Sequence, residues 1–144
     1  MDPRLLPDNP YLLLTPGPLS TSKGVKASMF RDWCTWDDDY NALVQKVRAE
    51  LVRLAGGGEG VTAVLMQGSG TFCVESVIGT AIPRDGRLLV LSNGAYGARI
   101  GQIAERLCIS LVVKDYGELE PPRADDVARM LDADPAVTHV AVVH

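Results

Sequence analysis

A glycine-rich segment with two hydroxyl side chains has the residue types of a phosphate site. Residues 67–71, Gln-Gly-Ser-Gly-Thr, follow an apolar run and precede apolar residues at helical spacing. The first backbone N–H groups of a helix have no partner inside the helix, and the helix dipole favours negative charge there. Glycines let a ligand approach the backbone, and hydroxyls can donate to phosphate oxygens. We therefore predict a phosphate site at Ser69, Gly70 and Thr71, the alternative being a glycine turn whose hydroxyl caps the helix.

Two more specific phosphate motifs do not fit this segment. A dinucleotide-binding fingerprint requires a third glycine where Cys73 stands, and an acidic residue at the end of the next strand, where the sequence has Ser92 and Asn93. A P-loop requires a lysine after its last glycine, and none follows Gly70. The segment therefore predicts phosphate binding by backbone and hydroxyl groups alone.

An aromatic side chain follows the next predicted strand. Residues 92–97, Ser-Asn-Gly-Ala-Tyr-Gly, come directly after an apolar run at 88–91. Ligands of parallel α/β sheets bind beyond the carboxyl ends of the strands, so we expect Tyr96 to lie beside the phosphate segment. Its ring has the shape to stack on a flat cofactor, and the alternative is ordinary packing at the start of a helix.

Strands and helices alternate along most of the chain. The predicted strands span residues 61–66, 88–91, 111–113 and 140–144, and the predicted helices span residues 40–54, 74–82, 100–107 and 124–131. Continuous apolar strands between amphipathic helices are typical of a parallel sheet that is covered on both faces. The predicted fold class is therefore α/β, preceded by a proline-rich extended arm over residues 1–24.

Composition argues against several classes of partner. The chain of 144 residues has a net charge of -4, and its basic residues are scattered, so we do not expect it to bind nucleic acid. No apolar run is long enough for a membrane span or a signal peptide, so we expect a cytoplasmic protein without a membrane partner. Cys34, Cys73 and Cys108 are widely spaced in apolar surroundings, and we expect them to be reduced and buried.

Four blocks of the sequence resemble, in order, those of the 2-aminoethylphosphonate:pyruvate transaminases, which are class V aminotransferases dependent on pyridoxal 5'-phosphate (PLP). They are residues 12–18 (Leu-Leu-Leu-Thr-Pro-Gly-Pro), 34–40 (Cys-Thr-Trp-Asp-Asp-Asp-Tyr), 67–71 and 92–99. The first and third blocks resemble class V aminotransferases in general, whereas the aspartate-rich block resembles the phosphonate enzymes in particular. The resemblance extends over essentially the whole chain.

The resemblance implies a fold, a cofactor and site residues. It implies the large domain of the aspartate-aminotransferase type of fold, with residues 1–36 as an extended arm and linker and residues 37–144 as part of the PLP-binding large domain. It also implies a homodimer in which Ser69, Gly70 and Thr71 hold the cofactor phosphate and Tyr96 stacks on the cofactor ring. The arm at Gly17 is implied to lie near the substrate.

The resemblance further implies transfer of the amino group of 2-aminoethylphosphonate to pyruvate. The lysine and the acidic residue that PLP chemistry requires are expected beyond residue 144, so we assign no catalytic residue and expect the isolated chain to be inactive. Two alternatives remain at this point. One is another class V transaminase that uses alanine or serine with glyoxylate, and the other is a noncatalytic fragment that binds phosphate or dimerises.

Overall fold

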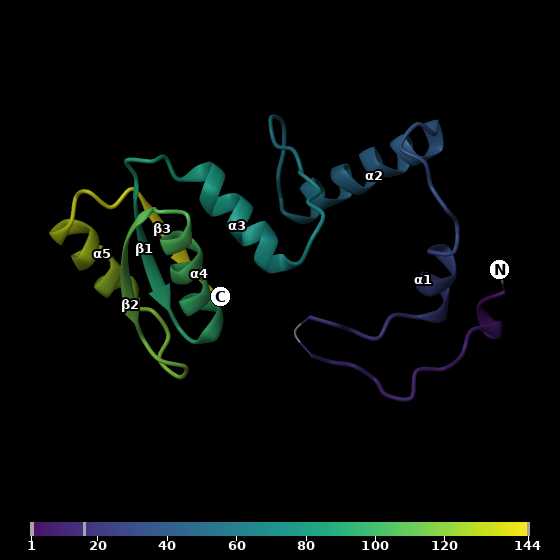
Figure 1. The fold of residues 1–144 in the computed structure, drawn as a ribbon, viewed down its shortest axis with the longest axis horizontal. Coiled ribbons are helices and arrows are strands. Elements are labelled where there is room, and N and C mark those ends of the chain that lie inside the picture. The colour runs from purple at the N-terminus through teal and green to yellow at the C-terminus, as the bar shows by residue number, and fades with distance from the viewer. Residues whose placement is uncertain (1, 16, 144) are drawn as a thin grey trace. The chain divides into compact units, whose positions relative to one another are not determined.

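The computed structural model describes residues 2–15 and 17–143, which fall into two compact units, Met1–Leu65 and Met66–His144 (Figure 1). The first unit contains a short 3-10 helix η1 (Pro3–Leu5) and the helices α1 (Lys23–Ser28) and α2 (Asp38–Leu54). The second unit contains, in chain order, α3 (Gly70–Ala81), β1 (Arg87–Ser92), α4 (Ala95–Arg106), β2 (Ser110–Asp115), α5 (Ala124–Ala133) and β3 (His139–Val142).

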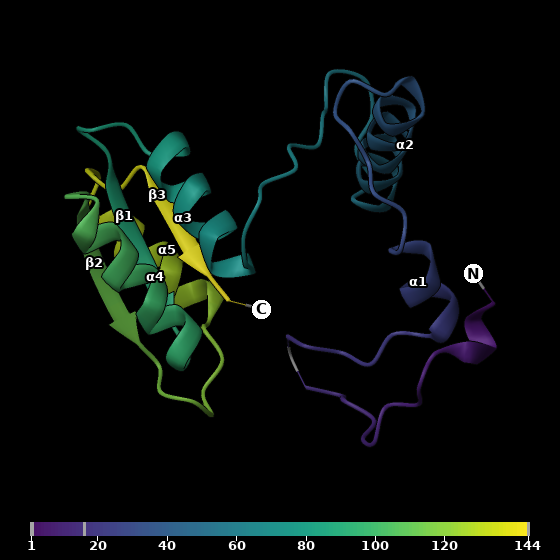
Figure 2. The same ribbon diagram turned by 45° about the vertical axis from the view of Figure 1, so that its right-hand side comes forward.

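The three strands form a parallel sheet in the order β2-β1-β3. The chain crosses from β1 to β2 in one direction and from β2 past β1 to β3 in the other. Right-handed crossovers therefore place α4 and α5 on opposite faces. Figures 1 and 2 show α3 and α4 on one face of the sheet and α5 on the other. The predicted α/β class, with a parallel sheet covered on both faces, is confirmed.

The core of the second unit lies between β1 and the helices α3 and α4. Leu88, Leu89 and Val90 of β1 are almost completely buried. The largest cluster of buried apolar side chains comprises Ile78, Ile82, Leu88, Val90, Ile100, Ile103, Ala104 and Ile109. Burial of so many branched side chains is the main force that holds α3 and α4 on β1. This core anchors α4 along its length, whereas it anchors α3 at its C-terminal end, through Ile78 and Ile82.

The predicted strand at residues 61–66 is absent, and this prediction is wrong for the structure. Val61 and Val64 are 54% and 74% exposed. A strand needs a neighbour for its ladder of hydrogen bonds, and no described strand pairs with this run. Arg48 of α2 instead donates from Nε to the carbonyl oxygen of Ala63 at 2.8 Å and from Nη2 to the hydroxyl of Thr62 at 2.7 Å. The apolar run is thus held by a side chain rather than by a sheet.

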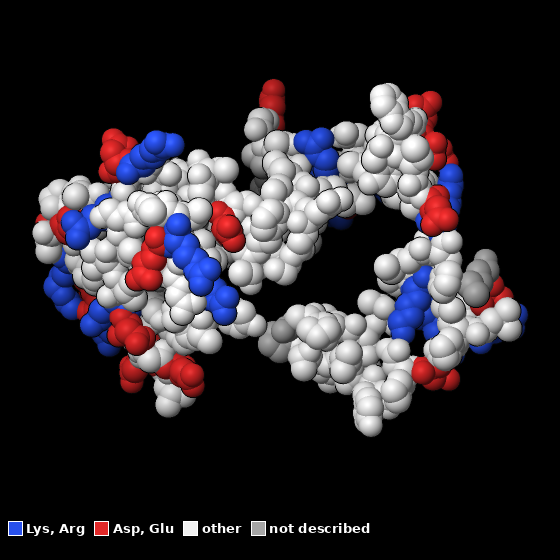
Figure 3. Space-filling model, viewed as in Figure 1, with Lys and Arg blue, Asp and Glu red and all other residues white. Residues whose placement is uncertain are grey.

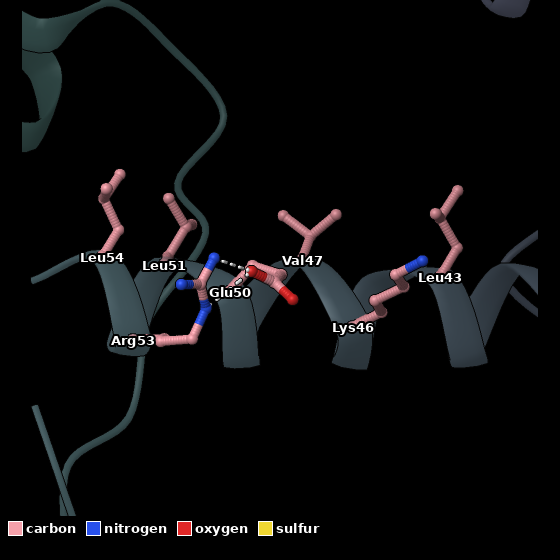
Figure 4. A pocket seen from close by; sticks show the side chains of 7 residues that line it. All are labelled: Leu43, Lys46, Val47, Glu50, Leu51, Arg53 and Leu54. Atoms are coloured by element: carbon pink, nitrogen blue, oxygen red, sulfur yellow. Dashed lines mark hydrogen bonds and ion pairs between the residues drawn. The ribbon is translucent and has the colours of Figure 1, made fainter.

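The first unit confirms the predicted helix near residues 40–54 and corrects the N-terminal arm. The arm is not extended throughout, because residues 23–28 form α1, with the Ser22 hydroxyl accepting a bond from the Val25 amide at 3.2 Å. Figure 4 shows that α2 is amphipathic, with four apolar side chains along one side and charged side chains beside them. The four are Leu43, Val47, Leu51 and Leu54, and each is at least 40% exposed.

The three cysteines are free, as expected, but all three are exposed. Their expected burial is wrong because the core is confined to β1 and to the helix faces that carry residues such as Ile78 and Ile103. No helix within residues 2–15 and 17–143 is long and apolar enough to cross a membrane.

Cys108 occupies a backbone conformation that favours glycine. Its φ angle is 57°, in the left-handed region. The amide of Ile109 donates to the carbonyl of Ala104 at 3.0 Å, and the amide of Cys108 donates to the carbonyl of Glu105 at 3.0 Å. This pair of bonds is the Schellman motif that ends many helices, usually with glycine at the left-handed position. The sequence places a cysteine there instead.

We expect Cys108→Gly to raise the free energy of unfolding by about 0.5 to 1 kcal/mol. Removing the Cβ relieves the left-handed strain, and the added freedom of the unfolded chain offsets part of that gain. Urea unfolding followed by circular dichroism measures the change. Cys108→Ala is the matched control, because it removes the thiol and keeps the Cβ. Equal stability of the glycine and alanine variants would contradict this interpretation.

Candidate functional site

The predicted phosphate segment forms the start of α3. Ser69 is the residue before the helix, and the amide of Cys73 donates to the Ser69 carbonyl at 3.2 Å. The amides of Gly70, Thr71 and Phe72 donate to no acceptor among residues 2–15 and 17–143. The Ser69 side chain makes no capping bond to this helix. Three backbone donors are therefore free at a helix end that favours negative charge.

The glycines of this segment have different roles. Gly68 has a φ angle of +144°, and a Cβ there would lie 2.8 Å from Cδ1 of Phe72. Glycine is thus required for the turn that leads into α3. A Cβ at Gly70 would meet no side chain or loop atom of the described residues within 4 Å, so they leave open space beside the free amides. Free donors, open space and a helix N-terminus together fit a phosphate group.

Tyr96 lies in the first turn of α4, just after β1. The helix begins after Gly94, whose φ angle of +121° turns the chain sharply at the end of the strand. The Tyr96 side chain is 64% exposed, so it is not a packed residue of its unit. Figures 1 and 2 show that α3 and α4 both begin at the end of the sheet to which the strands point. The structure therefore brings Ser69, Gly70, Thr71 and Tyr96 to one edge.

Sequence reasoning gave no role to Asn93, although it lies in the same segment as Tyr96. Its amide nitrogen Nδ2 donates to the carbonyl oxygen of Val143, just past β3, at 2.9 Å. The carbonyl of the preceding Ser92 accepts from the amide of Tyr116, just past β2, at 2.8 Å. The end of β1 is thereby tied to both neighbouring strands. The feature of the sequence that indicates a structural role for Asn93 is its position as a polar residue between a buried strand and a glycine turn.

Gly17 lies in the first unit, whereas the other predicted site residues lie in the second. It has a φ angle of +124° and sits in a turn where Leu14 and Leu19 form an antiparallel bridge. The Thr15 hydroxyl donates to the carbonyl of Pro18 at 3.0 Å, and the Ser20 hydroxyl accepts from the amide of Leu13 at 2.8 Å. Pro16 is outside the described residues. The arm at Gly17 is thus a tight turn closed by hydroxyl groups.

The aspartate-rich block begins a helix and makes a surface ion pair. Asp37 precedes α2, and Asp38 and Asp39 lie in its first turn, where the dipole favours carboxylates. Asp39 pairs with Arg31 at 2.8 Å, and the hydrogen bond from this guanidinium lowers the pKa of the Asp39 carboxyl. The stabilisation from this pair is present near neutral pH and is lost as the pH falls through that lowered pKa. The described residues contain no cluster of three potential His, Cys, Asp or Glu metal ligands.

Comparison with known proteins shows one consistent set of relatives. A transaminase of Syntrophobacter fumaroxidans named for 2-aminoethylphosphonate and pyruvate is 60% identical over all 144 residues, which correspond to 39% of its length. A Bacillus cereus protein of the same name is 58% identical over 138 residues, 95% of this chain and 40% of that protein. Over its whole length the chain is therefore similar to part of the 2-aminoethylphosphonate–pyruvate transaminases. It spans about two fifths of the length of these relatives. No family model matches it.

Solved structures of aminotransferases have the same fold. Pyridoxamine–pyruvate aminotransferase from Mesorhizobium loti matches 95% of this chain and 35% of its own, with a TM-score of 0.83 and 26% identity. Alanine–glyoxylate aminotransferase from Nostoc sp. matches 100% of this chain and 39% of its own, with a TM-score of 0.83 and 22% identity. The predicted aminotransferase type of fold is therefore confirmed.

Gly97 holds the first turn of α4 against the end of β1, and its substitution tests this contact. A Cβ at Gly97 would lie 2.7 Å from Cα of Ser92, which cannot move without displacing the strand. We expect Gly97→Ala to lower the free energy of unfolding by about 1 to 3 kcal/mol. Differential scanning calorimetry measures the loss.

Gly101→Ala is the matched control on the same helix. A Cβ at Gly101 would be 3.6 Å from Cγ2 of Val113, an ordinary contact, and alanine favours helix more than glycine. This control should be neutral or stabilising. Equal effects of the two substitutions would show that helix propensity, rather than close contact with Ser92, governs Gly97.

Proposed function

We propose that this chain supplies the phosphate-binding part of a PLP-dependent transaminase. The reaction would move the amino group of 2-aminoethylphosphonate to pyruvate and give phosphonoacetaldehyde and L-alanine. The observation that carries the proposal is 60% identity, over all 144 residues, to a transaminase named for these two substrates. The free amides at the start of α3 support it independently, because they suit the phosphate of the cofactor.

The residues of the second unit would bind and orient the cofactor. The amides of Gly70 and Thr71, with the hydroxyls of Ser69 and Thr71, would donate to the phosphate oxygens. The exposed ring of Tyr96 would stack on the pyridine ring and restrict its tilt. When bound, PLP supplies an electron sink for the carbon that carries the amino group.

The first unit would contribute the arm near the substrate. Gly17 offers a backbone without a side chain at a turn closed by Thr15 and Ser20, and no atom of another described residue that could contact a Cβ there lies within 4 Å of its position. Such a turn can approach a small amino donor closely. We propose the division of the family fold into residues 1–36 as arm and linker and residues 37–144 as part of the large domain.

We also propose that the active assembly is a cytoplasmic homodimer, as the family resemblance implies. The exposed apolar side chains on α2, such as Leu54 at 81% exposure, support contact with further protein surface. Size-exclusion chromatography with light scattering on an assembled enzyme measures its stoichiometry.

A chimera tests the proposed reaction. Residues 1–144 would replace the aligned segment of the Syntrophobacter fumaroxidans transaminase. The alignment with that transaminase includes every residue of this chain. We expect the chimera to bind PLP and to form alanine from pyruvate only when 2-aminoethylphosphonate is supplied. The parent transaminase is the control. A folded, PLP-loaded chimera that uses alanine or serine with glyoxylate and ignores the phosphonate would contradict the proposal.

The hydroxyls at the start of α3 provide a second test in the same chimera. We expect Ser69→Ala with Thr71→Ala to weaken PLP binding by about 1 to 3 kcal/mol, because two donors to a charged group are lost and the backbone donors remain. Titration of the apoenzyme with PLP measures the change. Thr80→Ala is the control, since its hydroxyl donates to the Ser76 carbonyl at 2.6 Å near the other end of α3. If Thr80→Ala weakens PLP binding as much as the double substitution does, the hydroxyls of Ser69 and Thr71 are not part of the phosphate site.

A further inference from the structure

The turn between β1 and Tyr96 is joined to the end of β3 by one side chain, that of Asn93. The β1–β3 ladder pairs Leu91 with Val142, and the backbone then leaves the sheet at Gly94. Asn93 continues the connection, because its Nδ2 donates to the carbonyl of Val143 at 2.9 Å in partly buried surroundings. The side-chain amide of Asn93 thus adds a hydrogen bond between β1 and β3 just beyond the last backbone pair of their ladder.

Local packing fixes only one side of this turn. The start of α4 is held against β1 by the close approach of Gly97 to Ser92. At Gly94 itself, only Cγ of Glu118, at 3.8 Å, lies within 4 Å of where a Cβ would be among residues 2–15 and 17–143. Glycine with free space around it allows several backbone conformations. Within the described part of the chain, the Asn93 bond to Val143 is therefore the side-chain hydrogen bond that joins this turn to the end of β3.

We propose that Asn93 is a positioning residue that sets the Tyr96 ring for a planar, phosphate-bearing ligand. This inference rests on the proposed function, in which Tyr96 stacks on the cofactor. Asn93 does not contact the ligand in this account. It restricts the turn before Tyr96, so the ring meets the ligand without first losing conformational freedom.

The test uses the chimera and measures two ligands. We expect Asn93→Ala to weaken PLP binding about tenfold and to reduce the induced circular dichroism of the bound cofactor. Binding of inorganic phosphate should change less than about twofold, because the α3 amides are untouched. Asn93→Asp should behave like Asn93→Ala, since a carboxylate of similar shape cannot donate to the Val143 carbonyl.

A double-mutant cycle separates positioning from a general structural role. We expect Asn93→Ala to have little further effect on PLP binding once Tyr96→Ala is present. Asn41→Ala is the matched control, because its Nδ2 donates to the Thr35 carbonyl at 3.2 Å in the first unit, and it should leave both ligands unaffected.

Four outcomes would overturn the inference. Additive effects of Asn93→Ala and Tyr96→Ala would show that the two residues act independently. Parallel loss of phosphate and PLP binding in both Asn93 variants would show a structural role only. If Tyr96→Ala leaves PLP binding and the induced circular dichroism unchanged, both the proposed stacking and the role of Asn93 are wrong. If Tyr96→Ala weakens PLP binding and Asn93→Ala does not, only the role of Asn93 is wrong.

Discussion

Unpaired backbone donors at the start of one helix are the constraint on which the candidate site depends. The amides of Gly70, Thr71 and Phe72 have no acceptor in the described part of the chain, and water or an anion must satisfy them. Gly68 makes the turn that exposes them, and the absence of a Cβ at Gly70 leaves room for a ligand. A site of this kind binds phosphate without any charged side chain, which is why no arginine or lysine is needed there.

The parallel sheet supplies the second half of the arrangement. Because the strands run in the same direction, each exits at the same edge, and the helices that lead to the next strand begin at that edge and run back to the opposite one. This places the start of α4, with Tyr96, at the same end as the start of α3 (Figure 2). Figure 3 shows acidic and basic side chains interspersed on a mainly uncharged surface, and residues 67–72 and 92–98 include neither Lys nor Arg. The candidate site is therefore built from backbone and neutral groups.

The sequence allowed the second unit to be predicted well because its signals are local. The helical spacing of Ile100, Ile103 and Ala104 places α4, and these residues are buried as expected. The run at residues 61–66 was misread, since strand formation depends on a partner that periodicity cannot reveal. The bond between Asn93 and Val143 joins residues far apart in the chain, so only the folded sheet shows it. The left-handed Cys108 was missed for a local reason, because glycine is the residue that usually marks a helix end of this kind.

The central claim is that the start of α3 holds the cofactor phosphate. A crystal structure of the PLP-loaded chimera tests it most directly. The account predicts phosphate oxygens at about 3 Å from the amide nitrogens of Gly70 and Thr71, with the ring of Tyr96 stacked on the pyridine ring. A phosphate bound elsewhere, with these amides facing only water, would contradict it.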